Sequence, residues 1–161
     1  MVTRELGSTG IQVSPVGLGC WQFSGGGSLA GGYWPPMDEE TIGDIVEESL
    51  QGGVNWFDTA EAYGRGQSEE ALARALQSAG REPGSVVIAT KWFPILRTAA
   101  SIGDTLPQRL TPLSPFPVDL HQIHTGFGAL STKRAQVAAV AKLVEEDRIQ
   151  AVGVSNFSAR A

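Results

Sequence analysis

Four short apolar, β-type stretches of this chain each end in a polar side chain, at a nearly constant interval. The polar residues are Asp58, Lys91, His124 and Ser155, which are separated by 33, 33 and 31 residues. A strand with its loops and a helix takes roughly 30 or more residues, so each interval fits one βα unit. Side chains gathered at the carboxyl ends of successive parallel strands are the arrangement of a (β/α)8 barrel active site. Together with an earlier stretch at Val16–Cys20, the spacing predicts an α/β fold with about five parallel strands.

The stretch Val54–Gly64 adds a phenol to this set. Its apolar run ends at Asp58, and Tyr63 follows five residues later. Glycines flank the stretch on both sides, which indicates a short buried strand that opens into a loop. Four titratable groups are therefore expected at one barrel mouth: Asp58, Tyr63, Lys91 and His124.

This set is suited to giving a proton to a developing alkoxide. A phenol is a poor acid at neutral pH, and an adjacent ammonium stabilises its deprotonated form. The carboxylate of Asp58 keeps Lys91 charged, since an isolated buried ammonium tends to lose its proton. His124 either orients a carbonyl oxygen or shares in delivering the proton. General acid catalysis contributes about 10²–10⁴-fold, but none of these groups is a reductant, so hydride must come from a cofactor.

The length of the chain bounds how much of a barrel it can form. A complete (β/α)8 barrel takes about 250 residues, and this chain has 161. Residues 1–161 are therefore expected to be the N-terminal portion of a single barrel domain that stops after strand five. The first and fifth strands are then exposed edges, through which two such chains could self-associate, although no sequence feature requires it.

Local patterns predict the elements before the third strand. Residues 3–14 are expected to form a β-hairpin that plugs the barrel. Asp38 opens a helix that ends at two glycines and buries one apolar face, formed by Ile42, Ile45, Val46 and Leu50. Ser68 is expected to cap a second helix, in which Glu69 and Glu70 are ordinary carboxylates of the first turn.

The two later connections between strands differ in how clearly their sequences predict a helix. Gly103 and Pro107 interrupt residues 101–110, which predicts a short or broken helix there. The last helix is expected to begin at Ser131 or Thr132 and to bury a stripe formed by Val137, Val140, Ala141 and Val144.

Glycines at the start of the chain invite two interpretations. Gly17 and Gly19 do not open a dinucleotide fingerprint, because Gln22 stands where a third glycine is needed. Close approach of the backbone explains both glycines better. The glycine-rich residues 24–36 form a long loop at the mouth, in which Tyr33 and Trp34 either line a substrate pocket or pack on the rim.

Composition excludes several classes of protein. The net charge is -5 and no basic stripe accompanies it, which argues against nucleic acid as a partner. Cys20 is the single cysteine, so there is no intrachain disulfide and no cysteine metal cluster. His121 and His124 point to opposite faces of a strand, so they cannot share a metal ion. No apolar run of membrane-spanning length and no signal peptide stands in the sequence, and a cytoplasmic location is expected.

The strand-end residues and their neighbours resemble the sequence motifs of the aldo/keto reductase family, and the resemblance covers the whole chain. The motifs are Phe57-Asp58-Thr59-Ala60-Glu61-Ala62-Tyr63-Gly64, Thr90-Lys91, Gln122-Ile123-His124 and Gly153-Val154-Ser155-Asn156-Phe157. The resemblance implies a barrel that reduces aldehydes or ketones with a nicotinamide cofactor, NADP(H) with NAD(H) not excluded. It assigns the general acid to Tyr63, its tuning to Lys91 and Asp58, and the orientation of the carbonyl to His124.

The resemblance also implies a set of cofactor contacts. Ser155 and Asn156 are expected to bind the nicotinamide carboxamide, and the chain near Cys20 and Trp21 to lie against the cofactor or the substrate. Asp58 is counted with these residues. In the family, the segments that hold the pyrophosphate and the adenosine 2′-phosphate follow the part that this chain matches. Thr125-Gly126-Phe127 stands where the family commonly has Trp-Pro after the histidine, which changes the shape of the substrate pocket.

Three alternatives stay open. Lys91 would form a Schiff base in a barrel aldolase, which borohydride trapping detects. A second alternative is a cofactor-sensing or partner-binding module of the same family, which binds nicotinamide without repeated turnover. In the third, the chain is a fragment of a reductase that binds NADPH weakly and turns over poorly alone.

Overall fold

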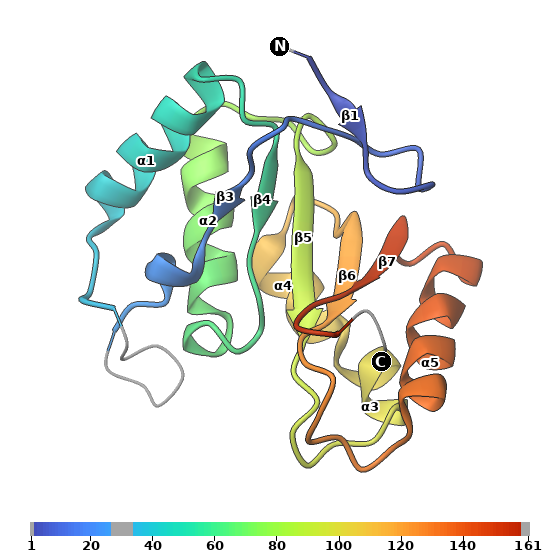
Figure 1. Cartoon of the computed structure of the whole chain (residues 1–161). Helices are drawn as coiled ribbons and strands as arrows, with labels where there is room; N and C mark the ends of the chain where they lie inside the picture. The colour runs from blue at the N-terminus through green and yellow to red at the C-terminus, as the bar shows by residue number, and fades with distance from the viewer. Residues whose placement is uncertain (1, 27–33, 159–161) are drawn as a thin grey trace.

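A computed structural model describes residues 2–26 and 34–158 of the chain. Five parallel strands form one sheet in the order β3-β4-β5-β6-β7 (Figure 1). Their bounds are Leu18–Gly19 for β3, Trp56–Asp58 for β4, Val87–Trp92 for β5, Leu120–Ile123 for β6 and Ala151–Val154 for β7. Each strand pairs with the next one in the sequence, as in a (β/α)8 barrel. The predicted partial barrel with five parallel strands is confirmed.

The predicted N-terminal hairpin is confirmed as well. Strands β1 (Arg4–Glu5) and β2 (Gln12–Val13) pair antiparallel and lie beside the amino ends of the parallel strands (Figure 1). Ile11 and Val13 are buried in a small apolar cluster with Ala89, Leu120 and Ala151 of the sheet. Because this cluster fills the end opposite the carboxyl ends of the strands, only the other end is left for a site.

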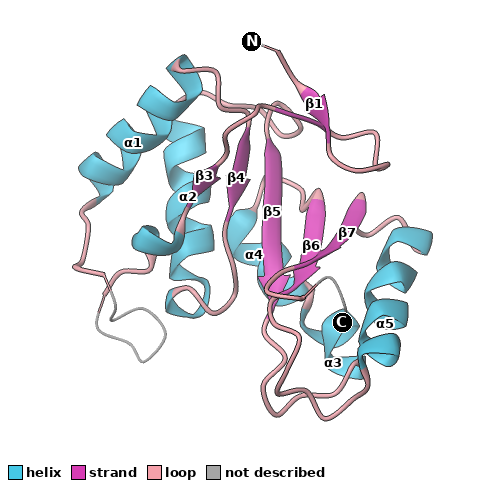
Figure 2. Cartoon of the chain, viewed as in Figure 1, coloured by secondary structure: helices cyan, strands magenta, loops and turns pink. Residues whose placement is uncertain are grey.

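In the described part of the chain, five α-helices lie around the outer face of the sheet (Figure 2). Their bounds are Glu39–Gln51 for α1, Gln67–Ser78 for α2, Ala100–Thr105 for α3, Pro107–Leu113 for α4 and Lys133–Glu145 for α5. Two short 3-10 turns, η1 (Trp21–Phe23) and η2 (Gly64–Gly66), stand after β3 and before α2. The division of the third crossover into α3 and α4 confirms the predicted break, and Pro107 occupies the first position of α4.

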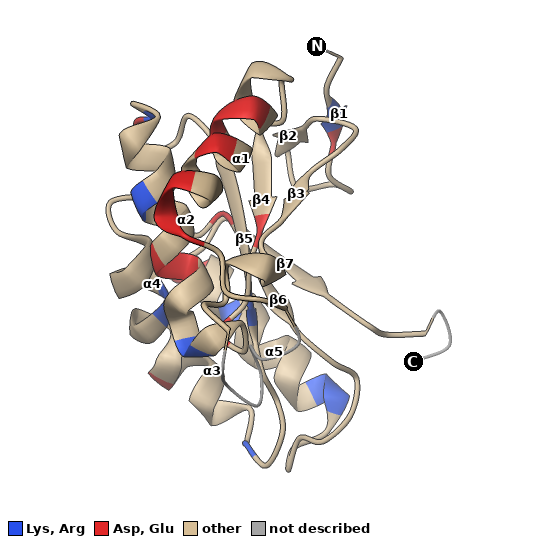
Figure 3. Cartoon of the chain, turned by 90° about the vertical axis from the view of Figure 1, so that its left-hand side faces the viewer, with Lys and Arg blue, Asp and Glu red and all other residues tan. Residues whose placement is uncertain are grey.

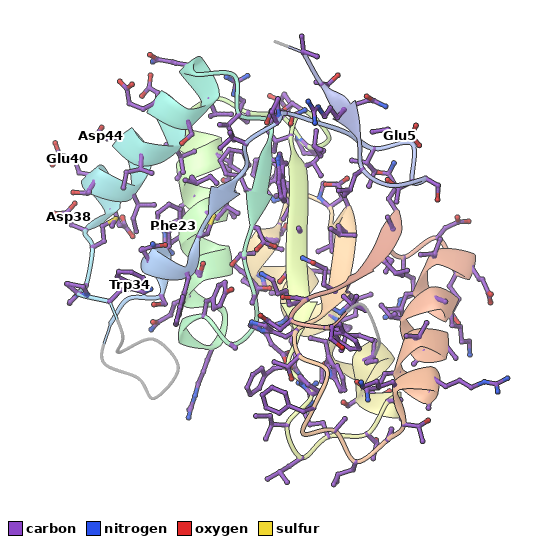
Figure 4. The ribbon with its side chains drawn as sticks, in the orientation of Figure 1. Glu5, Phe23, Trp34, Asp38, Glu40 and Asp44 are labelled. Atoms are coloured by element: carbon purple, nitrogen blue, oxygen red, sulfur yellow. The ribbon has the colours of Figure 1, made fainter. Side chains whose placement is uncertain are left out.

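Helix α1 matches its sequence pattern closely. The side chain of Asp38 accepts the amide of Thr41 at 2.7 Å, and Ile42 and Val46 are buried. Acidic residues occupy much of the helix (Figure 3), and the side chains of Asp38, Glu40 and Asp44 point away from the sheet (Figure 4). These carboxylates are exposed, so their arrangement is that of a solvated helix face.

The prediction that Ser68 caps α2 is wrong. The helix begins at Gln67, and Gly66, with φ +99°, takes the cap position. Ser68 is fully buried instead, and its hydroxyl donates to the carbonyl of Cys20 at 2.6 Å. A buried hydroxyl needs hydrogen-bond partners, and Ser68 finds them in the carbonyl of Cys20 and the hydroxyl of Thr59, not in an amide of its own helix.

The buried stripe predicted for α5 is partly wrong. Thr132 caps the helix through the amide of Ala135 at 3.2 Å, as expected. Val140 is buried, but Val137 is 44% exposed. The residues buried beside Val140 are Gln136 and Leu143, so the inward face is turned by about one residue.

Gly17 and Gly19, at the first parallel strand, differ in whether a side chain would fit there. A Cβ at Gly17 would lie 2.2 Å from the indole of Trp56, which confirms the need for close approach there. A Cβ at Gly19 would meet no atom within 4 Å, so the same explanation is wrong for Gly19. Among residues 2–26 and 34–158, no helix has the length and apolarity to cross a membrane.

Candidate active site

The ammonium of Lys91 is the centre of the polar cluster at the carboxyl ends of the strands. It lies 2.7 Å from Oδ2 of Asp58 and donates to the carbonyl of Thr59 at 2.8 Å. The side chain of Lys91 is 4% exposed and that of Asp58 is 30% exposed. The sheet brings these residues together because Asp58 ends β4 while Lys91 continues the neighbouring β5. The buried ammonium therefore has both a carboxylate and a carbonyl as hydrogen-bond acceptors, which a buried charge requires.

Tyr63 meets the same ammonium from the loop after β4. Its hydroxyl oxygen is 3.4 Å from Nζ of Lys91, and Nζ lies 5.0 Å from the centroid of the ring. Gly64 allows this turn, because its φ is +64° and a Cβ there would lie 2.3 Å from the carbonyl of Ser24. The amide of Tyr63 donates to Ala60 at 3.0 Å, which closes the turn.

His124 follows β6 and lies against the phenol. The two ring centroids are 5.6 Å apart with an interplanar angle of 85°, and Phe93 packs on the other edge of the imidazole at 5.6 Å. Burial, and then the charge of Lys91, lower the pKa of His124 from 6.5 to about 4. Its Nδ1 is buried and has no hydrogen-bond partner among the residues that the structure describes. The imidazole is therefore neutral at physiological pH.

Two indole rings follow the phenol of Tyr63 in succession. The indole of Trp21, in η1, stacks on the phenol at 5.8 Å and 22°. Trp34 meets the indole of Trp21 edge-on at 5.9 Å, near the start of the loop that leads into α1 (Figure 4). Tyr33, predicted to line the same loop, lies outside the described residues.

The side chain of Cys20 lies in the packed interior. Its side chain is fully buried, and its Sγ lies 3.5 Å from the carbonyl of Leu18. The backbone amide of Cys20 donates to Asp58 at 2.9 Å, while its carbonyl accepts from Ser68. Burial raises the pKa of the Cys20 thiol far above its ordinary value. The thiol is therefore part of the packed interior, and a cofactor or substrate contact of the chain near Cys20 and Trp21 stays a prediction.

Ser155 and Asn156 follow β7 beside the imidazole. The amide of Ser155 donates to Ile123 at 2.9 Å, which continues the ladder beyond the strand. Nδ2 of Asn156 donates to the carbonyl of His124 and lies 3.0 Å from the hydroxyl of Ser155. A φ of +58° turns Asn156 out of the strand direction. Both polar side chains therefore stand at the same end of the sheet as the cluster around Lys91.

Gln122 is a member of the cluster that sequence reasoning did not single out. Its Nε2 donates to Oδ1 of Asp58 at 3.0 Å, so each oxygen of this carboxylate has a partner. The available signal was the alternation of β6, because Gln122 and His124 are two residues apart and share a face. His121 lies on the opposite face, as predicted, and is buried.

A second group of charges is buried behind the mouth, and the sequence did not predict it. Oε2 of Glu69 lies 2.9 Å from Arg109, and Oε1 accepts the hydroxyl of Thr90 at 2.6 Å. Burial raises the pKa of Glu69 to about 7, against the opposing effect of Arg109. Glu69 stands in the first turn of α2, as predicted, but the sequence did not indicate that its side chain would be 0% exposed.

Two curated relatives are similar to nearly the whole chain. Aldo-keto reductase YhdN of Bacillus subtilis is 34% identical over 167 residues, which cover 98% of this chain and 48% of that protein. Uncharacterized oxidoreductase Rv2298 of Mycobacterium tuberculosis is 36% identical over 147 residues, or 91% of this chain and 43% of the relative. The chain thus spans about half the length of the curated relatives it matches.

The fold and the family agree with these relatives. The solved holo form of aldo-keto reductase AKR11C1 from Bacillus halodurans superimposes with a TM-score of 0.79 at 26% identity, covering 98% of this chain and 51% of that one. The model of the aldo/keto reductase family matches residues 15–161, which include all five parallel strands. The chain therefore belongs to the aldo/keto reductase family.

Proposed function

We propose that the chain carries the proton-donating half of an enzyme that reduces an aldehyde or ketone to an alcohol with a nicotinamide cofactor. The observation that carries this proposal is the position of Nζ of Lys91, 2.7 Å from Asp58 and 3.4 Å from the hydroxyl of Tyr63. NADP(H) is the proposed cofactor, as the family resemblance implies, and NAD(H) is the alternative that the binding assay separates. Residues 1–161 are proposed to be the N-terminal portion of one barrel domain, because the relatives are about twice as long.

Tyr63 is the proposed general acid. Its hydroxyl gives its proton to the carbonyl oxygen of the substrate, where negative charge develops as the carbon is reduced. The ammonium of Lys91 stabilises the phenolate that remains, because opposite charges at this distance attract strongly in a buried site. Asp58 in turn holds the ammonium in place, and Gln122 binds the other oxygen of the carboxylate.

His124 is proposed to orient the substrate and not to protonate it. Its pKa of about 4 leaves the imidazole neutral at pH 7, and a neutral imidazole has one N–H to donate. The ring lies against Tyr63, so a carbonyl oxygen bound by the imidazole would also be near the phenol. This arrangement favours the first of the two roles predicted for His124.

The residues at the mouth fit a nicotinamide group. A carboxamide needs both donors and acceptors, and the side chains of Ser155 and Asn156 supply both beside His124. Trp21, 37% exposed, offers an apolar ring face next to Tyr63. When bound, the cofactor supplies the hydride that no side chain of the cluster can provide. The backbone near Cys20, and Asp58, are proposed to border this group.

The rim of the mouth favours a carbonyl substrate with an apolar body. Ile95, Leu96 and Phe127 come from the loops after β5 and β6 and are 40%, 76% and 68% exposed. Exposed apolar side chains grouped near a polar cluster are typical of a binding surface.

The test combines fluorescence titration with NADPH or NADH and a turnover assay with a series of aldehydes and ketones. Tyr63→Phe and Lys91→Met are expected to lower turnover by about 10²-fold or more, while nicotinamide binding changes little. Lys142→Met is the matched control, because Lys142 is exposed and forms a surface ion pair with Glu146 at 3.5 Å. Turnover that survives Tyr63→Phe unchanged would refute the assignment.

The same assay separates the alternatives. Because the chain spans about half of its relatives, we expect the 161-residue chain alone to bind NADPH weakly and to turn over poorly. Micromolar binding with steady turnover would refute this expectation, and binding without turnover would indicate a sensing module. Lys91 donates to three oxygens as an ammonium, which does not suit an attacking amine. Borohydride trapping of a carbonyl substrate on Lys91 would establish the aldolase alternative.

A further inference from the structure

A buried carboxylate lies on the loop that carries the phenol. Glu61 stands two residues before Tyr63, and its side chain is 11% exposed. Its Oε1 accepts the backbone amide of Phe93 at 2.5 Å and also forms a short ion pair with Nη1 of Arg97. Glu61 therefore ties the loop after β4 to the loop after β5.

Arg97 anchors this carboxylate to the scaffold. Its Nη1 donates to the carbonyl of Phe93 at 3.1 Å, and its Nη2 donates to the hydroxyl of Thr105, in α3, at 2.6 Å. Its Nε donates to Ser101 at 3.2 Å, and its guanidinium lies 5.2 Å from the ring centroid of Trp92. An arginine with every arm engaged has one geometry, so it defines where Glu61 and Phe93 stand.

The ion pair is connected to the candidate active site through Phe93 and through the backbone of Glu61. The ring of Phe93 packs on His124 at 5.6 Å, and the backbone amide of Glu61 donates to the carbonyl of Lys91 at 3.2 Å. The carbonyl of Arg97 also accepts the amide of Leu130, from the loop after β6, at 2.9 Å. Three loops that carry or cover the proposed catalytic groups are thus joined at one half-buried ion pair.

The pair does not deliver charge to the site. Glu61 and Arg97 carry opposite charges that offset each other within the pair, and Arg109 lies 3.9 Å from Oε2 of Glu61. An ion pair of this kind acts on the reaction through geometry. Glu61 and Arg97 connect the loops at the mouth to one another, and Arg97 also connects them to α3.

We propose that Glu61 and Arg97 are positioning residues that set the spacing between Tyr63 and His124. The inference rests on the proposed function, because it assigns a purpose to the spacing of a proton donor and a substrate-orienting imidazole. Misplacing such groups by about 1 Å lowers turnover by about 10²-fold, so a rigid tie between their loops has a direct effect on the rate.

The first test follows the imidazole itself and needs no turnover. Proton NMR resolves the two histidines of the chain, and the resonance that disappears in His124→Gln identifies His124. In the unmodified chain His124 is expected to titrate at about 4. Glu61→Gln or Arg97→Lys lets water reach the ring as Phe93 loosens, and the midpoint is then expected to rise toward 6.5 by about one pH unit or more. Glu70→Gln, which removes an exposed carboxylate paired with Arg74, is expected to leave the titration unchanged.

The second test is kinetic. With a carbonyl substrate and NADPH, both variants are expected to lose kcat by about 10–100-fold while KM stays within about twofold. Turnover in the unmodified chain that is too slow to measure, as expected for a chain of this length, bears on the proposed function alone, and the NMR titration then decides the inference. Folded variants with an unchanged His124 titration would overturn it. Unfolding of both variants would show that the pair serves folding itself, which would also overturn the positioning role.

Discussion

Replacing Glu69 by glutamine is expected to stabilise the folded chain above pH 7, although the substitution removes an ion pair. The side chain of Glu69 is fully buried, 2.9 Å from Arg109, and it accepts the hydroxyl of Thr90. Burial raises its pKa to about 7, because loss of hydration outweighs the attraction of the guanidinium. Glutamine keeps the shape of the side chain and an acceptor for Thr90. Arg109 would still lie 3.9 Å from Glu61.

The magnitude follows from proton linkage. The pKa of Glu69 rises from 4.5 in the unfolded chain to about 7 in the folded chain. A carboxyl group with a raised pKa contributes stability that is fully present below 4.5 and is lost as the pH rises through 7. Since each tenfold change in proton affinity amounts to about 1.4 kcal/mol, the ionised glutamate lowers the free energy of unfolding by about 3 kcal/mol at pH 8.

The assay is urea denaturation between pH 5 and pH 8, followed by the fluorescence of the four tryptophans. The quantity of interest is the difference in unfolding free energy between Glu69→Gln and the unmodified chain. This difference cancels the titration of other groups, among them Asp119, whose pKa is raised by burial, and both histidines. It is expected to be about 3 kcal/mol at pH 8 and below about 1 kcal/mol at pH 5.

Glu70→Gln is the matched control, because Glu70 is the next residue of α2 and its side chain is 58% exposed. Its difference from the unmodified chain is expected to stay within about 0.5 kcal/mol at every pH. A Glu69→Gln difference that is independent of pH, or an unmodified chain that is the more stable at pH 8, would refute the reasoning. Either result would mean that attraction to Arg109 exceeds the penalty of burying the charge.

Three further predictions concern packing and backbone conformation. Gly17→Ala is expected to lower the free energy of unfolding by about 1–3 kcal/mol. The new methyl group would collide with the indole of Trp56, which a 3.1 Å hydrogen bond to Ser14 holds in place. Unchanged stability in urea denaturation would contradict this. Leu96→Gly is expected to raise the free energy of unfolding by about 1 kcal/mol, since Leu96 has φ +56° and is 76% exposed. A loss of stability in the same assay would show that contacts of the leucine side chain outweigh the backbone strain. The thiol of Cys20 is expected to react with a disulfide reagent only in denaturant, because it is fully buried and burial raises its pKa; prompt labelling of the folded chain would exclude this packing.

Much of the fold could be predicted because its cause is periodic or local. Each βα unit uses a similar length of chain, so equal spacing of polar residues indicated parallel neighbours with their reactive ends on one side. Asp38 and Thr132 cap helices through amides three residues away, a contact that depends only on nearby sequence. The meeting of Asp58, Lys91, Tyr63 and His124 follows from the same regularity.

Predictions failed where the partner of a side chain is distant in sequence. Ser68 resembles a helix cap, but the carbonyl of Cys20, 48 residues earlier, takes its hydroxyl. Glu69 resembles an ordinary first-turn carboxylate until the guanidinium of Arg109 and the hydroxyl of Thr90 are placed around it. Nothing in the local pattern around Glu61 indicates that Arg97 would bury it.

The sequence by itself determined the order of the strands and the side on which the polar residues gather, since strand alternation and unit length are properties of the chain. Tertiary structure alone decided which charges are buried, which hydroxyls serve carbonyls, and that Cys20 faces the packing and not the mouth. The physical reason is that burial and hydrogen bonding depend on which residues the fold brings near, and those neighbours come from other βα units.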